Sequence, residues 1–319
     1  MKSDNYLIVE WRTAQRRAIR DGLGEGLVKI GVDERVVVLS GDLAASTRVK
    51  KFEEVYPERF FEMGVAEQNM AGVAGGMASE GLIPFISSYA VFSPGRNWEQ
   101  IRVSVAMSHQ NVKIIGGHAG VATGKNGPTH QATEDIALMR ALPGMTVIVP
   151  ADANQCAAAV EASYKHDGPV YVRTTRPETP DFTKKQVFEI GKAQVYREGR
   201  DLTICACGIQ VWDALMVAEE LSKEGIECEV INVASVKPLD TKTVVESAQK
   251  TGKVITIEDH QIEAGMGGAI AEVLAEECPV PVLRIGLKNQ FGVSGEWEEV
   301  YKQVGLDRAS LVKKIRDWV

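Results

Sequence analysis

The chain has 319 residues, 45% hydrophobic and 25% charged, which is the composition of a soluble globular protein with room for two domains of ordinary size. Its formal net charge of −7 argues against general electrostatic binding to nucleic acid or to an anionic membrane surface. Five cysteines without a C-x-x-C pair, and the lack of any apolar run of signal-peptide or membrane-span length, predict a cytoplasmic protein in a reducing compartment.

Strand-like and helix-like segments alternate along residues 1–177. Val36–Ser40 is a short, almost wholly apolar run, typical of a strand buried on both faces. Alternation of this kind implies a parallel sheet covered by helices on both sides. The other predicted strands are 83–88, 112–116, 146–149 and 170–173, the helices are 13–31, 67–80, 98–108, 133–141 and 154–164, and 117–129 is predicted as a long loop.

A polar segment with two prolines separates a second alternating unit from the first. We predict a linker at 178–194 and a second α/β domain at 195–319. The fold class is therefore α/β with two domains. The predicted strands of the second domain are 202–206, 227–233, 254–258 and 282–285, and its helices are 211–223, 241–249, 268–277 and 308–319.

Glu67 is the strongest single candidate for chemistry. It stands in Gly64-Val65-Ala66-Glu67-Gln68-Asn69-Met70, where an apolar, small-residue setting would raise the pKa of a carboxyl group and favour proton sharing with a ring nitrogen. A glutamate that only offsets the helix dipole is an equally good explanation from spacing alone. The glycines that follow, at 72, 75 and 76, favour close approach to another helix or a ligand, so this helix is predicted to lie at an interface.

Aromatic and imidazole side chains follow Glu67. Phe85, Tyr89 and Phe92 could stack on a flat ring, although core packing explains such residues at least as well. His118 and His130 flank a glycine-containing loop, where histidines can act as acid, base or hydroxyl-binding groups. No cysteine or carboxylate completes a zinc site with them.

Two further sets of residues have competing explanations. Arg12, Arg173 and Arg176 lie near predicted element ends, where a guanidinium could bind a phosphate or simply remain a solvated charge. Glu258-Asp259-His260 ends a predicted strand, as catalytic clusters do in open sheets, but a structural or interface role is favoured.

Taken together, three motifs give the chain a resemblance to transketolase, from about Trp11 to the C-terminus. Ser40-Gly41-Asp42-Leu43 is similar to that family's acidic strand-end turn, and Gly64-Val65-Ala66-Glu67 to the segment with its catalytic glutamate. Residues 124–131, GKNGPTHQ, resemble the substrate-binding loop. The resemblance covers only the second half of the family: the pyrimidine-binding domain and the C-terminal domain.

The resemblance implies thiamine diphosphate as cofactor and a role for each matching residue. Glu67 would bond a ring nitrogen of the aminopyrimidine, and the aromatic residues Phe92, Tyr89 and Phe85 would line its pocket, with Asp42 near the cofactor at a subunit interface. His118 and His130 would contact the sugar carbonyl and hydroxyls and act catalytically. The remaining substrate-binding residues would be Asn126, Arg12, Ser46 and Arg176, with Arg173 as a weaker candidate.

One departure and one absence shape this expectation. Asn126 stands where the family usually has Asp, which puts the substrate preference in doubt. The chain has no Gly-Asp-Gly segment for Mg²⁺ and the diphosphate, so no metal ligands are expected here. The resemblance therefore implies the C-terminal subunit of a split transketolase that acts on sugar phosphates, with a diphosphate-binding partner subunit, self-association through the pyrimidine domain and an α2β2 assembly.

Other members of the same enzyme class remain open. A deoxyxylulose phosphate synthase-like subunit or the beta subunit of a 2-oxo acid dehydrogenase first component would share the fold and the glutamate. A chain that only scaffolds a catalytic partner is the alternative from a different class, although the presence of Glu67, His118 and His130 argues against it.

Overall fold

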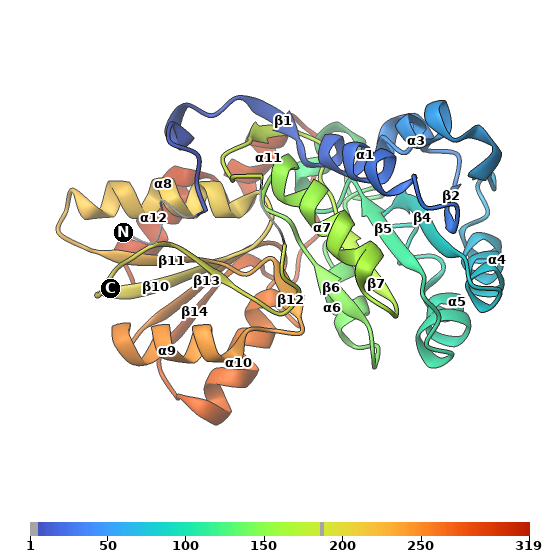
Figure 1. The fold of residues 1–319 in the computed structure, drawn as a ribbon. Helices are drawn as coiled ribbons and strands as arrows, with labels where there is room; N and C mark the ends of the chain where they lie inside the picture. Colours follow the sequence, from blue (N-terminus) through green and yellow to red (C-terminus); the bar gives the residue numbers. More distant parts are fainter. Residues whose placement is uncertain (1–5, 186–187) are drawn as a thin grey trace.

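The computed structural model describes residues 6–185 and 188–319. Two α/β units lie side by side, each with a central sheet, and a small two-stranded sheet connects distant parts of the chain (Figure 1). The expected fold class is confirmed in both units. Within the described ranges, no helix combines the length and the apolar character that crossing a lipid bilayer requires.

The first unit is built on a seven-stranded sheet in the order β12-β6-β7-β5-β4-β2-β3, in which only β12 runs antiparallel. Its strands are β2 (Val36–Ser40), β3 (Phe60–Glu62), β4 (Ile83–Tyr89), β5 (Lys113–Gly117), β6 (Thr146–Ile148), β7 (Val170–Arg173) and β12 (Ser235–Lys237).

Helices cover both faces of this sheet. The alternation of side chains along β2 shows why: Val36 and Val38 enter one apolar cluster, and Val37 and Leu39 enter the other. The helical segments of this unit are η2 (Trp11–Thr13), α1 (Ile19–Ile30), α2 (Ala44–Thr47), α3 (Lys50–Val55), η3 (Pro57–Arg59), α4 (Glu67–Ser79), α5 (Trp98–Gln100), the π-helix η4 (Ile101–Met107), the 3₁₀ segment η5 (Val121–Asn126), α6 (Asp135–Arg140) and α7 (Ala153–Lys165).

The second unit has a five-stranded sheet in the order β14-β13-β10-β11-β9, parallel except for β9. Its strands are β9 (Gln194–Arg197), β10 (Leu202–Ala206), β11 (Cys228–Asn232), β13 (Val254–Gln261) and β14 (Val282–Leu287). Its helices are α8 (Gln210–Ser222), α9 (Thr241–Thr251), α10 (Met266–Glu277), α11 (Trp297–Val304) and α12 (Arg308–Arg316).

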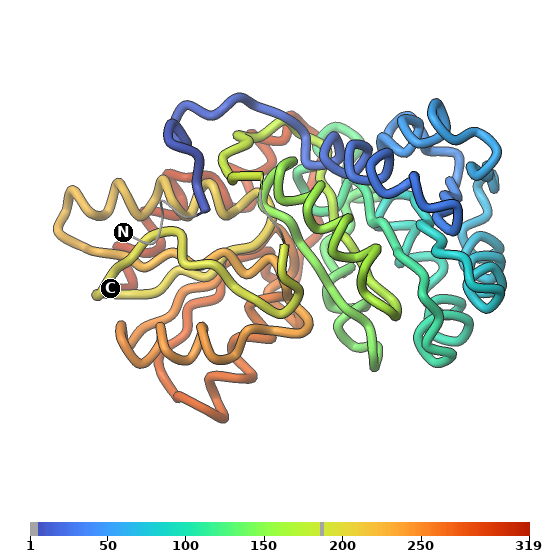
Figure 2. Tube along the Cα trace, viewed as in Figure 1, coloured from blue at the N-terminus to red at the C-terminus, as the bar shows by residue number. Residues whose placement is uncertain are grey.

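The two units exchange segments. Strand β12, from the second half of the sequence, pairs with β6 of the first sheet. In the other direction, the N-terminal segment runs along the second unit before it enters α1 (Figure 2). There Trp11 packs against Trp212 with ring centroids 5.7 Å apart.

Several elements differ from the sequence expectation because long-range pairing overrides the local pattern. Residues 16–18, expected at the start of a helix, form strand β1 (Arg16–Ala18). Its antiparallel partner, β8 (Glu178–Pro180), lies in the expected linker, of which residues 186–187 fall outside the description. Helix α1 does not end at its glycines. Gly22 instead allows helix α7 to pack closely, because a Cβ there would lie 1.9 Å from the Ala153 carbonyl oxygen of α7. Helices α2, α3 and α11 and strands β3 and β12 were not expected.

Candidate active site

The candidate residues gather at the carboxyl ends of neighbouring parallel strands. Strands β2, β4, β5 and β7 are adjacent in the first sheet, and Asp42, Tyr89, His118 and Arg176 follow or end them. This edge of an open α/β sheet is where ligands bind in such folds.

Glu67 begins helix α4 and is almost completely buried, with 1% of its surface exposed. Both carboxylate oxygens have partners: Ser88 Oγ donates to Oε1 at 3.1 Å, and Arg96 Nη1 pairs with Oε2 at 2.6 Å. Asn97 Nδ2 also donates to the Glu67 carbonyl oxygen at 3.1 Å. The sequence predicts an apolar setting for Glu67. In the structure the carboxylate instead has two polar partners, which hold it in one orientation.

Four rings form one cluster beside this acid. The Tyr89 and His118 ring centroids are 4.0 Å apart, Tyr89 and Phe92 are stacked at 6.2 Å, and His130 meets Phe92 edge-on at 5.5 Å. Arg96 lies over the Phe92 ring at 4.5 Å and so connects the cluster to Glu67. The structure therefore brings together Glu67, both histidines and two of the three expected aromatic residues.

His118 is 3% exposed and contacts an arginine that the sequence did not single out. Arg20 Nη1 lies 3.0 Å from His118 Nε2 and also donates to the Ser46 carbonyl oxygen at 2.8 Å. Because a guanidinium can only donate, Nε2 accepts and the proton belongs on Nδ1, which is buried without a partner. Burial and the nearby arginines lower the pKa of His118 to about 3, so this imidazole is neutral at physiological pH.

Positive charge converges beside His118. Burial and the neighbouring Arg48 and Arg176 lower the pKa of Arg20, and its Nε atom is buried without a hydrogen-bond partner. These neighbouring guanidinium groups, of which Arg48 also pairs with Asp21 at 2.8 Å, are suited to an anionic ligand.

The loop after β5 brings the remaining polar groups. Asn126 is exposed and lies next to Arg176, whose Nη1 is 3.5 Å from Asn126 Oδ1 and also donates to the Thr123 carbonyl oxygen. His130 is half-buried, and its Nδ1 lies 2.9 Å from Thr129 Oγ1. His130 thus shares the Tyr89 ring with His118, and Asn126 contacts Arg176, one of the arginines whose charge acts on His118.

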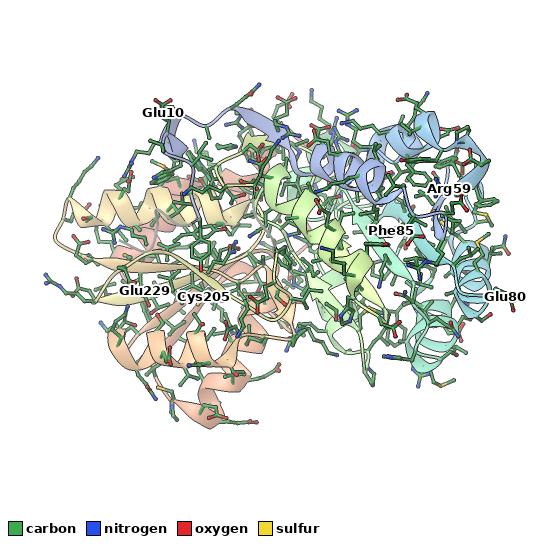
Figure 3. All side chains as sticks on the ribbon, viewed as in Figure 1. Glu10, Arg59, Glu80, Phe85, Cys205 and Glu229 are labelled. Atoms are coloured by element: carbon green, nitrogen blue, oxygen red, sulfur yellow. The ribbon has the colours of Figure 1, made fainter. Side chains whose placement is uncertain are left out.

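Three predicted site residues have other roles in the structure. Phe85 is fully buried in the apolar cluster with Val38 and Leu27, on the β4 face opposite Ser88, so it is a core residue and not part of a cofactor pocket (Figure 3). This corrects its assignment as a cofactor-binding residue.

The assignment of Arg173 is also corrected, and Arg12 has other partners in this structure. Arg173 is buried in an ion pair with Asp135 at 2.8 Å, which leaves its guanidinium committed inside the protein. Arg12 pairs with Glu219 of helix α8 and lies over Trp11 at 4.4 Å, so its described contacts are with the second unit and its own neighbour. Neither contacts the ring cluster through any bond described in the structure.

Asp42 and Ser46 flank the cluster more loosely. Asp42 is exposed, with φ of 60°, and its backbone N–H donates to Glu62 Oε1 at 2.7 Å. Ser46 meets Arg20 through its carbonyl oxygen, not its hydroxyl. Their expected roles remain predictions.

The residues that sequence reasoning missed are Ser88, Arg96, Arg20 and Arg48. Each acquires its role through a partner far along the chain, such as His118, 98 residues after Arg20. No local motif marks them. Within residues 6–185 and 188–319, no group of three or more His, Cys, Asp or Glu side chains is arranged to hold a metal ion.

Comparisons with known proteins agree with this arrangement. The family model for the transketolase pyrimidine-binding domain matches residues 15–181, and that for the transketolase C-terminal domain matches residues 191–311. A putative transketolase C-terminal section of Methanocaldococcus jannaschii is 43% identical over 306 residues, which covers 94% of this chain and 96% of the relative. A 6-deoxy-6-sulfo-D-fructose transketolase subunit of a Clostridium species is 44% identical over 282 residues, 88% of each chain.

A solved structure extends the similarity to three dimensions. A split-gene transketolase, described as an inactive β4 tetramer, superposes with a TM-score of 0.88 at 44% identity and covers 94% of this chain and 97% of its own. The chain therefore belongs to the transketolase family and is similar, over nearly its whole length, to chains that form one part of a split transketolase.

Proposed function

We propose that this chain is the C-terminal subunit of a two-chain, thiamine diphosphate-dependent transketolase that moves a two-carbon ketol unit from an anionic ketose to an aldose phosphate. The observation that supports it most is the buried Glu67 carboxylate beside the Tyr89, Phe92, His118 and His130 rings. A fixed acid, an aromatic wall and hydroxyl-binding groups at one sheet edge fit a heteroaromatic cofactor and a sugar together.

The residues present fit the aminopyrimidine half of the cofactor. Glu67 would share a proton with a ring nitrogen, and Phe92, over which Arg96 lies, would line the pocket of the ring. The bonds from Ser88 and Arg96 hold the Glu67 carboxylate in place for this contact. The cofactor, when bound, supplies the electron sink for breaking a carbon–carbon bond, and this chain contributes orientation and polarisation.

The diphosphate and Mg²⁺ would be held by a partner subunit. The sequence lacks Gly-Asp-Gly, and the described residues offer no cluster of candidate metal ligands. The relatives that are chains of split transketolases support this division. We propose an α2β2 assembly with self-association through the pyrimidine-binding unit.

The substrate would be a ketose with an anionic group at the end distant from its carbonyl. His118, neutral at physiological pH, has a buried Nδ1–H free to donate to a sugar oxygen, and His130 and Asn126 offer further hydrogen bonds. Arg20, Arg48 and Arg176 would bind the anion. A phosphate and the sulfonate in the name of the Clostridium relative are both anionic groups with several acceptor oxygens. The planar guanidinium of an arginine can bind either of them with paired hydrogen bonds.

Reconstitution tests the proposal. Mixing the chain with a candidate diphosphate-binding subunit should give ketol transfer that requires thiamine diphosphate and Mg²⁺, and Glu67→Gln should lower kcat at least about a hundredfold, as loss of a positioned proton-sharing group does. Circular dichroism and co-purification control for fold and assembly.

Two outcomes would contradict it. Activity that survives Glu67→Ala unchanged would support a chain that only scaffolds its partner, and robust turnover by the purified chain alone would show that no second subunit is needed.

A further inference from the structure

The loop that bears Asn126 and His130 is fastened to the second unit by one buried carboxylate. Asp259, in β13, is 3% exposed. Its Oδ1 accepts the Val121 backbone N–H at 2.9 Å and its Oδ2 accepts the Ala122 N–H at 3.1 Å, while the Tyr301 hydroxyl donates to Oδ2 at 3.0 Å. Two backbone N–H groups of the loop and one hydroxyl of the second unit thus donate to the same Asp259 carboxylate.

The loop backbone is shaped to let this carboxylate approach. Gly120 has φ of +78°, and a Cβ there would lie 2.1 Å from Asp259 Oδ2, so no other residue fits without displacing the acid. The Gly120 N–H is in turn bonded to the Ala132 carbonyl oxygen at 2.7 Å, which closes the base of the loop.

Further contacts from the second unit run along the same loop. Gln131 Nε2 donates to the Val293 carbonyl oxygen at 2.8 Å, and Lys125 pairs with Glu296 at 2.6 Å. A Cβ on Gly127 would lie 2.2 Å from Ser294 Oγ, which shows how closely the two segments pack.

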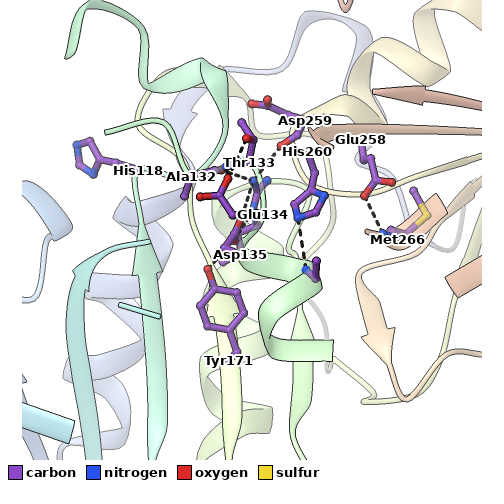
Figure 4. Close-up of polar contacts among 12 residues, drawn as sticks. His118, Ala132, Thr133, Glu134, Asp135, Tyr171, Glu258, Asp259, His260 and Met266 are labelled. Atoms are coloured by element: carbon purple, nitrogen blue, oxygen red, sulfur yellow. Dashed lines mark hydrogen bonds and ion pairs between the residues drawn. The ribbon is translucent and has the colours of Figure 1, made fainter. Parts of the chain in front are cut away.

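The strand that carries Asp259 is itself anchored to the first unit. Arg173 Nη2 donates to the Asp259 carbonyl oxygen at 2.9 Å, and Arg173 is held by its buried ion pair with Asp135, which also accepts from the Tyr171 hydroxyl at 2.6 Å (Figure 4). Arg173 thus supports the loop from inside the protein, which is the role that replaces its expected contact with substrate.

We propose that Asp259, supported by Tyr301, is a positioning residue: through it the C-terminal unit holds residues 119–131 so that His130 and Asn126 lie beside His118, and thereby sets the affinity for the ketose donor. The link to donor affinity rests on the proposed function. The fixing of the loop is testable without it.

Glu258 offers a matched control. It is an adjacent buried acid on the same strand and also accepts two backbone N–H groups, from Met266 at 2.7 Å and Gly267 at 2.8 Å. Those amides begin helix α10, and the Glu258 side chain points away from the loop (Figure 4). Glu258→Gln therefore removes comparable bonds without touching residues 119–131.

The test compares Asp259→Asn and Glu258→Gln in the full chain and in the reconstituted complex. Asn keeps the size of Asp259 but can accept at one oxygen only, so one loop amide loses its partner. We expect amide exchange in 119–131 to accelerate at least tenfold in Asp259→Asn alone. In the complex, KM for the ketose should rise at least tenfold, with kcat and the apparent affinity for thiamine diphosphate changed less than threefold.

The proposal is overturned if Asp259→Asn leaves loop exchange at the wild-type rate, or if both variants change exchange and donor KM alike, which would indicate general destabilisation. Absence of ketol transfer in the wild-type complex would instead contradict the proposed function. Amide exchange in the isolated chain would still show whether Asp259 fixes the loop.

Discussion

Single residues in this chain take their roles from where they lie along a strand and from the partners they meet. Tyr89 and Phe85 both belong to β4, yet only Tyr89, at the carboxyl end of the strand, joins the ring cluster, while Phe85 points into the core beneath α1. Glu67 differs from its expected setting in another way: its burial is real, but two fixed donors accompany it. Burial alone therefore does not distinguish a residue of the site, such as Tyr89 or Glu67, from a core residue such as Phe85.

A residue-scale prediction concerns Arg20. Arg20→Met should lower kcat/KM for a phosphorylated or sulfonated ketose by about ten- to a hundredfold, because hydrogen bonds to charged groups contribute about 1.5–3 kcal/mol. A free ketose without the anionic group should lose less, because only the contact of Arg20 with His118 affects it. Steady-state kinetics with both donors on the reconstituted complex measures the difference.

Arg12→Met is the matched control for this experiment. Arg12 pairs with Glu219 on the second unit, so its loss should change neither donor's kcat/KM by more than about twofold, as for an exposed ion pair. A larger effect at Arg12 than at Arg20 would restore the sequence-based assignment and contradict the structural one.

At the scale of elements, helix α4 has one packed and one open face. A Cβ on Gly75 would lie 2.7 Å from the Ser104 carbonyl oxygen of η4, whereas Gly72 and Gly76 have nothing within 4 Å. Apolar side chains are exposed nearby, with Val65 just before the helix at 70% and Met107 at the end of η4 at 69%. We propose that a second subunit packs on this open face.

The corresponding prediction is that Gly76→Leu weakens subunit association at least tenfold while the isolated chain keeps its melting temperature within a few degrees. A Cβ at position 76 has no atom of its own chain within 4 Å. Leucine also has a higher helix propensity than glycine, by somewhat less than about 1 kcal/mol. Sedimentation velocity measures association. Ala275→Leu, on the exposed side of α10, should leave association intact, and an equal loss in both variants would argue against this interface.

At the scale of the whole molecule, the two units are interlocked rather than merely linked. Strand β12 completes the first sheet, and the half-buried Lys237 at its end donates to the carbonyl oxygens of Arg140 and Leu142 at 2.8 and 2.5 Å, at the end of helix α6. Asp259 connects the units a second time through the loop. We therefore expect them to unfold together.

Lys237→Met tests this coupling. Loss of both bonds should lower the free energy of unfolding by about 1–3 kcal/mol. Native-state hydrogen exchange should show the same decrease in β5 of the first sheet and β10 of the second. Exposed Lys242→Met serves as the control, with an expected change below about 0.5 kcal/mol. A decrease confined to β10 would mean that the units unfold independently.

The sequence by itself determined the fold class, most elements and the candidate acid, because apolar periodicity and the segments around Glu67 and His130 are local patterns. It left open what depends on contacts between distant residues. These include the β1–β8 pairing, the bonds of Ser88 and Arg96 to Glu67, the arginines beside His118 and the hold of Asp259 on a loop 138 residues earlier. Such contacts exist only once the sheets have formed, since burial and strand order, and not spacing along the chain, decide which side chains meet.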